Sequence, residues 1–294
     1  MHVEPDIPDE GLAAARAECE AVLRRDDRDR WLASMFAPEA DRPHLHALYA
    51  FSNEIARIRD VVHEAMPGEI RLQWWRDALE TEERGAFGHP VLMSLKATLA
   101  ERRLPVRPLL DLIDARTFDL YDDPMPSLHS LEGYAGETQS ALFQLAALVL
   151  ARGEDPGTAD ASGHAGVAYA LTGLMRALPL HARRGQIFLP LDVLAGAGVS
   201  EADMRQGNDS AGLRIALADL RERARMHLDA AREALAKAPT AIKAAYLPLA
   251  LVPLWLRGME AAPPFEPVAD TAQWKRQWVL WRAAGKARRN KAFF

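Results

Sequence analysis

The sequence predicts an all-α protein, and three observations support this. Alanine and arginine recur along the whole chain, while the runs of β-branched residues typical of strands are scarce. Apolar residues recur at steps of three or four over most of the length, which is the period of an amphipathic helix. The only alternating stretch is the short segment 186–189. With 294 residues, 49% of them hydrophobic and 26% charged, the composition is that of a soluble globular protein.

The apolar periodicity places the helices in order along the chain. Helices are expected over 11–25 and 29–36, before a proline-bounded loop at 38–43. The next segment carries one apolar stripe from Leu45 to Val62, and Pro67 with Gly68 is expected to break the chain before a helix at 69–83. Ser127 and Thr240 are suitable N-cap residues. Further helices are predicted over 89–103, 107–121, 127–151, 158–179, 210–237, 240–259 and 271–286.

The chain divides into a single all-α domain over residues 1–262 and a proline-rich linker with a basic, Trp-rich C-terminal helix over 263–294. Residues 274–294 hold seven Lys/Arg and no acid, so of the net charge of −5 this tail carries +7 and the rest −12. Trp274, Trp278 and Trp281 share one helix face by their spacing. Two alternatives follow: residues 271–294 contact an anionic membrane surface, or the tryptophans dock onto the acidic body.

Several classes of protein are excluded or disfavoured. The single cysteine, Cys19, cannot form an intramolecular disulfide or supply a cysteine-based zinc site. No apolar stretch reaches the roughly 20 residues that a membrane-spanning helix needs, and the first residues lack the apolar core of a signal peptide. The acidic body does not favour nucleic acid as a partner. The expected location is the cytoplasm, with peripheral contact at the inner membrane as an addition.

Three blocks resemble the squalene/phytoene synthase family of head-to-head prenyltransferases. The first is YAFSNEIARIRD at 49–60 with LQWWRDAL at 72–79, the second is the segment 134–145, and the third is LTGLMRALPLHARRGQIFLPLD at 171–192. The resemblance spans residues 28–204 and implies the isoprenoid-synthase fold, an antiparallel helical bundle around a central apolar cavity. In active members, two DxxxD motifs face each other across the cavity mouth and hold Mg²⁺ ions that stabilise the leaving diphosphate.

The sequence departs from the family at these motifs. The carboxylate positions of the first motif are Ala56 and Asp60, and those of the second are Ala177 and His181. Three of the four carboxylates are therefore absent. This predicts a catalytically degenerate member that carries out no Mg²⁺-dependent prenyl transfer and has no cofactor.

The same blocks look like one branch of the family, which contains a mitochondrial assembly factor for respiratory complex I and its bacterial relatives. The branch implies a non-catalytic protein that assembles or stabilises complex I, with complex I subunits as partners. We expect the protein to keep the apolar cavity and to bind an isoprenoid or lipid ligand there. The alternative is an active head-to-head prenyltransferase or prenyl-diphosphate-processing enzyme with an altered, Mg²⁺-binding site. A third hypothesis is a soluble lipid carrier.

Residual candidates for catalysis are Asp60 and His181, since a histidine exchanges protons near neutral pH. Asp60 and Glu64, four residues apart, are candidates for a metal site, and an Arg-paired or solvated helix face is the alternative. The candidate ligand- and diphosphate-binding residues are aromatic and basic side chains of the three blocks, and structural ion pairing is the alternative for the arginines: Tyr49, Arg57, Arg76, Tyr134, Arg176, Arg183 and Arg184.

Overall fold

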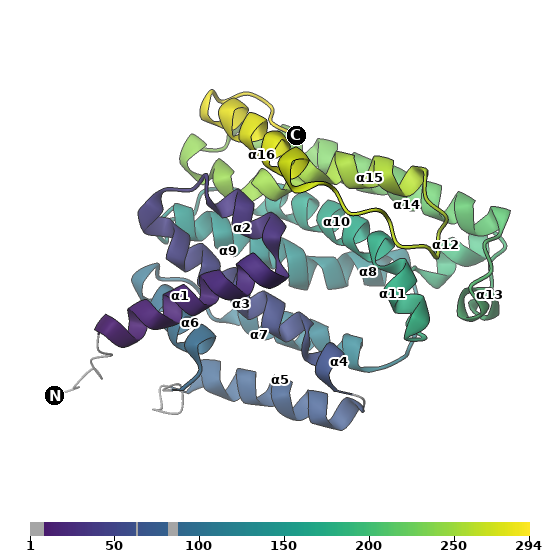
Figure 1. Cartoon of the computed structure of the whole chain (residues 1–294), viewed down its shortest axis with the longest axis horizontal. Helices are drawn as coiled ribbons and strands as arrows, with labels where there is room; N and C mark the ends of the chain where they lie inside the picture. The colour runs from purple at the N-terminus through teal and green to yellow at the C-terminus, as the bar shows by residue number, and fades with distance from the viewer. Residues whose placement is uncertain (1–8, 63, 82–87) are drawn as a thin grey trace.

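The computed structural model describes residues 9–62, 64–81 and 88–294, and every regular element in these ranges is a helix (Figure 1). The all-α prediction is therefore confirmed. Residues 186–189, which alternate like a strand, are irregular chain that belongs to no sheet. No helix in the described ranges is both long and apolar enough to cross a membrane.

The N-terminal half is built on α1 (Asp9–Asp26), which packs against α3 (Arg42–Ala56) and α6 (Pro90–Glu101). These helices present small and aliphatic residues to one another, and Cys19 is a buried free thiol in this contact. The connecting and neighbouring elements are α2 (Arg28–Ser34), η1 (Glu39–Asp41), α4 (Ile58–Val61), α5 (Ala65–Glu80) and α7 (Arg107–Arg116).

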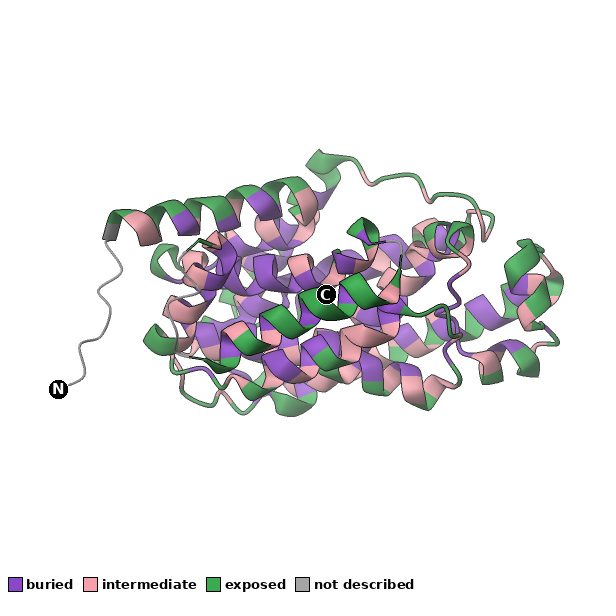
Figure 2. Ribbon diagram, turned by 90° about the horizontal axis from the view of Figure 1, so that it is seen from below, coloured by how far each residue is buried: buried purple, intermediate pink, exposed green. Residues whose placement is uncertain are grey.

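The C-terminal half is built around α10 (Ala159–Arg176), which packs along α14 (Ala211–Ala234) and also contacts α9 (Ala141–Leu150) and α15 (Val252–Glu260). Buried residues run through the middle of the bundle and exposed residues lie on its outer faces (Figure 2). One core cluster joins the two halves.

Several predicted helices are interrupted where the sequence indicates continuous ones. Residues 127–151 form α8 (Leu128–Ala135), a π turn η4 (Gly136–Ser140) and α9, and Ser127 caps α8 as predicted. The π turn carries Ser140 against Gly166 of α10, where an added Cβ would lie 2.1 Å from the Ser140 Oγ. The other interruptions produce η3 (Thr117–Leu120) after α7, α11 (Leu178–Arg183) after α10, η5 (Leu235–Lys237) after α14, and η6 (Thr240–Leu251) before α15.

The predicted break at Pro67 and Gly68 is wrong, because α5 begins at Ala65 and contains both residues. Proline is tolerated in the first turn of a helix, where its missing N–H has no intrahelical acceptor to lose. Gly68 is buried under Leu120, whose Cδ2 would lie 2.5 Å from an added Cβ. The glycine therefore permits a close approach rather than a turn.

Two short α-helices have no counterpart among the predicted elements. They are α12 (Leu191–Gly196) and α13 (Glu201–Gln206). The second begins with a capping box, in which Ser200 accepts from the Asp203 backbone N–H and the Asp203 carboxylate accepts from the backbone of Ser200. This Ser-x-x-Asp pattern is a sequence signal for the start of α13. Each of the two helices has only six residues, which is too short to show an amphipathic period.

The C-terminal helix α16 (Gln273–Arg288) packs on η6 and α2. Its buried face consists of small and aliphatic residues, among them Leu280, Ala283, Ala284 and Ala287. The alternative in which the tryptophans dock onto the body is therefore wrong. The three indoles are exposed on the outer side of α16. The small alanine side chains on the inner side allow α16 to lie close to the bundle.

Candidate functional site

The two degenerate motifs meet across an ion pair. Asp60 lies on α4 and Arg184 caps the C-terminus of α11, and Arg184 Nη1 donates to Asp60 Oδ1 at 2.6 Å. The structure thus brings the first and third blocks face to face, as the family resemblance implies. The contact between them joins a carboxylate to a guanidinium, in place of two carboxylates that share metal ions.

Asp60 and Glu64 do not form the expected pair on one helix face. Helix α4 ends at Val61, Val62 is extended, and Glu64 is the extended N-cap of α5. The i, i+4 geometry that would aim both carboxylates at one ion therefore does not form. This is a correction of the metal-site prediction, and the Arg-paired alternative describes Asp60.

The side chains at the four motif positions do not fit a Mg²⁺ cluster. Magnesium needs several oxygen ligands in near-octahedral geometry, whereas the four motif positions supply two alanines, a histidine and one carboxylate already paired with Arg184. Among the described residues, no group of three or more His, Cys, Asp or Glu side chains is arranged to hold a metal ion.

Below the ion pair lies an aromatic and polar cluster that links His181 to Tyr134. The ring of Phe188 lies 4.5 Å from His181 and 6.3 Å from Tyr134, measured between centroids. Tyr134 Oη accepts from Arg116 Nη1 at 2.7 Å and donates to Asp119 Oδ1 at 2.8 Å. The buried hydroxyl thus has both of its partners inside the protein, and burial raises the pKa of Tyr134.

His181 is poorly suited to accept a proton. Burial, followed by the positive charge of Arg184, lowers the pKa of His181 to about 4. The imidazole is therefore neutral at pH 7. It occupies a position where the family resemblance implies a negatively charged carboxylate that binds metal. Asp60 counteracts this shift only in part.

The interior holds a residue that the sequence analysis missed. Arg30 of α2 is buried, with its guanidinium 5.3 Å from the ring of Tyr49 and 4.9 Å from the ring of Tyr169. It also donates to Asp27 at 3.0 Å and to Gln139 of the π turn at 2.5 Å. The predicted ligand residue Tyr49 thus packs against an internal cation. In the sequence, Arg30 belongs to a charged stretch that looks like solvent-exposed helix.

The remaining predicted arginines do not gather at one place. Arg57 pairs with Asp26 of α1, and Arg76 pairs with Asp114 of α7. Arg176 lies 4.4 Å from the centroid of the Trp255 ring. Arg183 is exposed beside Arg184 at the end of α11. For Arg57 and Arg76, the structure therefore shows structural ion pairing, the alternative to ligand binding.

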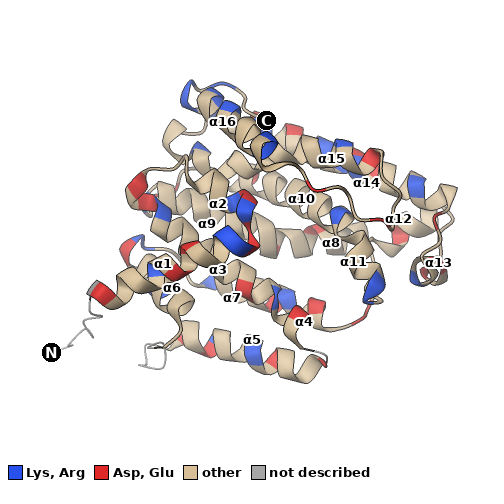
Figure 3. Ribbon diagram, viewed as in Figure 1, with Lys and Arg blue, Asp and Glu red and all other residues tan. Residues whose placement is uncertain are grey.

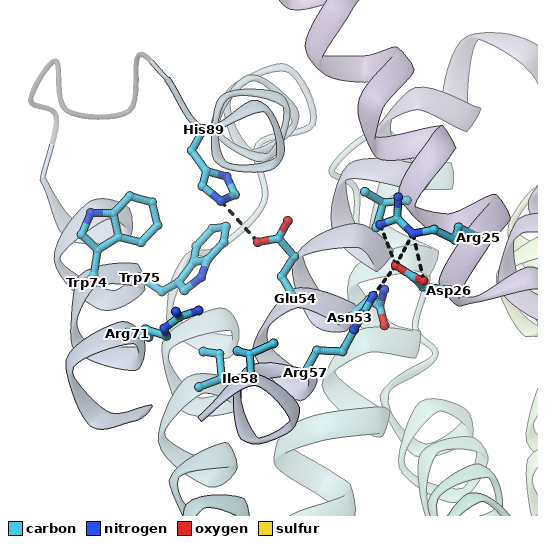
Figure 4. A pocket seen from close by; sticks show the side chains of 12 residues that line it. Arg25, Asp26, Asn53, Glu54, Arg57, Ile58, Arg71, Trp74, Trp75 and His89 are labelled. Carbon is cyan, nitrogen blue, oxygen red and sulfur yellow. Dashed lines mark hydrogen bonds and ion pairs between the residues drawn. The ribbon is translucent and has the colours of Figure 1, made fainter. Parts of the chain in front are cut away.

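A pocket of about 420 Å³ lies between α1, α3, α4 and α5 (Figure 4). Trp74 and Trp75 of α5 form one wall and Ile58 lies at its base. Three arginines and two carboxylates line it, a formal charge of +1: Arg25, Arg57 and Arg71 with Asp26 and Glu54.

Most of these charges are internally paired. Arg25 and Arg57 both contact Asp26, and Glu54 Oε2 lies 3.3 Å from His89 Nε2. Arg71 has no hydrogen-bond or ion-pair partner among the described residues. The pocket therefore offers aromatic walls and one free guanidinium.

Comparison with known proteins agrees with this architecture. The family model for squalene/phytoene synthase matches residues 23–282, which is most of the chain. The chain belongs to the squalene/phytoene synthase family. The predicted membership is confirmed, and so is the predicted fold class of this family.

Relatives within the family include proteins with different names. The "NADH dehydrogenase (ubiquinone) complex I, assembly factor 6" of Rattus norvegicus is 35% identical over 244 residues, covering 83% of this chain and 72% of that protein. The "Presqualene diphosphate synthase" of Sinorhizobium fredii is 27% identical over 279 residues, covering 90% and 98%. The predicted resemblance to the complex I assembly factor branch is thus confirmed.

A solved structure of a dehydrosqualene synthase in complex with ligand superposes with a TM-score of 0.78 and 16% identity, covering 95% of this chain and 98% of that one. At this identity the match shows the shared squalene/phytoene synthase fold.

Proposed function

We propose that this protein assembles or stabilises respiratory complex I and transfers no prenyl groups. Its identity to a complex I assembly factor exceeds its identity to the presqualene diphosphate synthase. The observation that carries the proposal is the ion pair between Asp60 and Arg184, in the place where the family's chemistry requires facing carboxylates.

The chemical reason is electrostatic. Departure of a diphosphate leaves several negative charges close together, and metal ions supply most of the stabilisation of that charge. Here the single remaining motif carboxylate is neutralised by Arg184, and His181 is uncharged at neutral pH. The mouth therefore has no cluster of oxygen donors with which to recruit magnesium.

The ligand proposed here is an apolar chain with an anionic end, an isoprenoid or a lipid, bound in the pocket between α1 and α5. A volume of about 420 Å³ falls within the roughly 300–1,000 Å³ of small-molecule sites. Trp74 and Trp75 would contact the apolar part, and Arg71 would pair with the anionic end. Such a protein would work in the cytoplasm beside the inner membrane, where complex I is assembled.

Deletion of the gene in its own host tests the assembly role. We expect less assembled complex I and less NADH-driven quinone reduction in isolated membranes, with succinate-driven reduction unchanged as the control. Complementation with the wild-type gene restores both. Wild-type amounts of complex I in the deletion strain would refute the role.

The second candidate function is a prenyltransferase, favoured by the match along 98% of a presqualene diphosphate synthase. Purified protein is incubated with farnesyl or geranylgeranyl diphosphate and Mg²⁺, and diphosphate release is followed. We expect none above background. Sustained release that disappears in Asp60→Ala would reverse the order of the two functions. Native mass spectrometry of the purified protein tests the third hypothesis, a lipid carrier, by the mass of any retained ligand.

A further inference from the structure

The outward face of α16 carries three exposed indoles. Trp274, Trp278 and Trp281 are 70%, 52% and 59% exposed, although tryptophan is normally buried in large part. Their spacing of four and three residues places them on one face, and the rings of Trp278 and Trp281 stack with centroids 5.2 Å apart. Three tryptophans on one solvated face form an apolar patch that folding does not explain.

The helix is held in place without these side chains. Leu280, Ala283 and Ala287 are buried against the bundle on the opposite face. Arg276, also buried, pairs with Asp29 at 3.4 Å and with Asp270. The position of α16 is therefore fixed by its inner face, and the tryptophans are left for another contact.

A basic stripe runs beside the indoles. It consists of Lys275, Arg282, Lys286 and Arg289, whose steps of seven, four and three residues keep them on one side of the helix. All four are exposed, as are Arg288 and Lys291 nearby, and Lys and Arg positions are marked blue along α16 in Figure 3. None of the six pairs with a carboxylate among the described residues, and residues 274–294 contain no acid.

We propose that the outer face of α16 and the turn that follows it, which carry the three tryptophans and the six unpaired cations, bind an anionic membrane surface. Indole rings prefer the boundary between headgroups and acyl chains, and adjacent Lys/Arg side chains are attracted to anionic lipid. A helix with both features lies in the plane of the interface. The inference stands on α16 alone and does not depend on the assembly role.

The charge of the rest of the molecule favours an orientation in which α16 faces the membrane. Excluding residues 274–294, the chain carries −12, so the body is repelled by an anionic surface while the outer face of α16 is attracted to it. A nucleic acid would also attract the cations. It would leave unexplained three exposed indoles on a helix whose opposite face is fixed to the protein.

Vesicle flotation of the full-length protein tests the proposal. The vesicles are phosphatidylcholine alone and phosphatidylcholine with about one third phosphatidylglycerol. We expect binding to the anionic vesicles only, a blue shift of the tryptophan emission, and loss of binding at high salt. Two variants are compared: Trp274→Ala/Trp278→Ala/Trp281→Ala, and a charge variant, Lys275→Gln/Arg282→Gln/Lys286→Gln/Arg289→Gln.

Each variant is expected to bind at least tenfold more weakly while unfolding at the wild-type temperature, since the changed side chains are exposed. The control is Ile215→Ala/Met226→Ala, which removes exposed apolar residues of α14 (63% and 62% exposed) and should float like wild type. Equal binding to neutral and anionic vesicles, full binding by either α16 variant, or absence of wild-type binding would overturn the proposal. So would α16-dependent binding to RNA or an acidic protein without vesicle binding.

Discussion

Arg184 donates a 2.6 Å hydrogen bond to Asp60 across 124 residues of sequence, and this contact joins α4 to the C-terminal end of α11. Both side chains are more than a third exposed. An exposed pair of this kind contributes about 0–1 kcal/mol to stability. The pair therefore matters for metal binding and not for stability, because Arg184 occupies Asp60, the one carboxylate that the two motifs retain.

Restoring the acids should restore metal binding. In the variant Ala56→Asp/Ala177→Asp/His181→Asp/Arg184→Gln, all four motif positions carry carboxylates and the guanidinium that pairs with Asp60 is removed. We expect this variant to bind Mg²⁺ in titration calorimetry and the wild type to give no signal. Arg184→Gln alone is the control and should also give none, because one carboxylate holds Mg²⁺ weakly. Wild-type binding equal to that of the restored variant would contradict the electrostatic argument.

The internal Arg30 should be essential for stability. Arg30→Met leaves Asp27 and Gln139 without their partner and removes the cation between Tyr49 and Tyr169. Breaking a buried pair in this way costs about 3–5 kcal/mol. Urea denaturation measures the loss.

The matched control for Arg30 is Arg28→Met. Arg28 lies two residues earlier in the same helix and is exposed. Its replacement should change the unfolding free energy by no more than about 0.5 kcal/mol. Similar effects at the two positions would mean that the internal contacts of Arg30 contribute nothing.

Stability should fall on mild acidification. Burial, reinforced by Arg102 and Arg16, lowers the pKa of His44 to about 4, whereas the unfolded value is about 6.5. The unfolded chain therefore binds more protons between these two values, so the free energy of unfolding is largest above pH 6.5 and declines as the pH falls towards 4. His181 contributes in the same direction.

His44→Gln isolates one part of this effect, since glutamine can still bond to Thr98, which lies 3.1 Å from His44 Nδ1. Urea denaturation at pH 7 and pH 5 should show a smaller difference for the variant than for the wild type. Identical differences would show that His44 is protonated equally in both states.

The sequence predicts the periodic helices and the meeting of the first and third blocks, because each depends on a pattern that repeats or on motifs in a known order. It does not predict the pair between Asp60 and Arg184, since nothing local connects residues so far apart. Arg30 was missed for a related reason: a sequence displays charge but not burial. The split between Asp60 and Glu64 follows from the end of α4 at Val61 and the extended backbone of Val62 and Glu64, which the apolar stripe does not predict.

The close approach of the π turn to α10 should make Gly166 intolerant of any side chain. An added Cβ would lie 2.1 Å from the Oγ and 2.2 Å from the backbone N of Ser140, so Gly166→Ala must separate the two elements. We expect a loss of about 2 kcal/mol or more, as for an overpacked core. Gly163→Ala on the same helix meets no atom within 4 Å and should stabilise the protein by up to about 1 kcal/mol, because alanine is the better helix former. Thermal unfolding of the two variants separates these effects. A stabilised Gly166→Ala would show that η4 and α10 do not pack this closely.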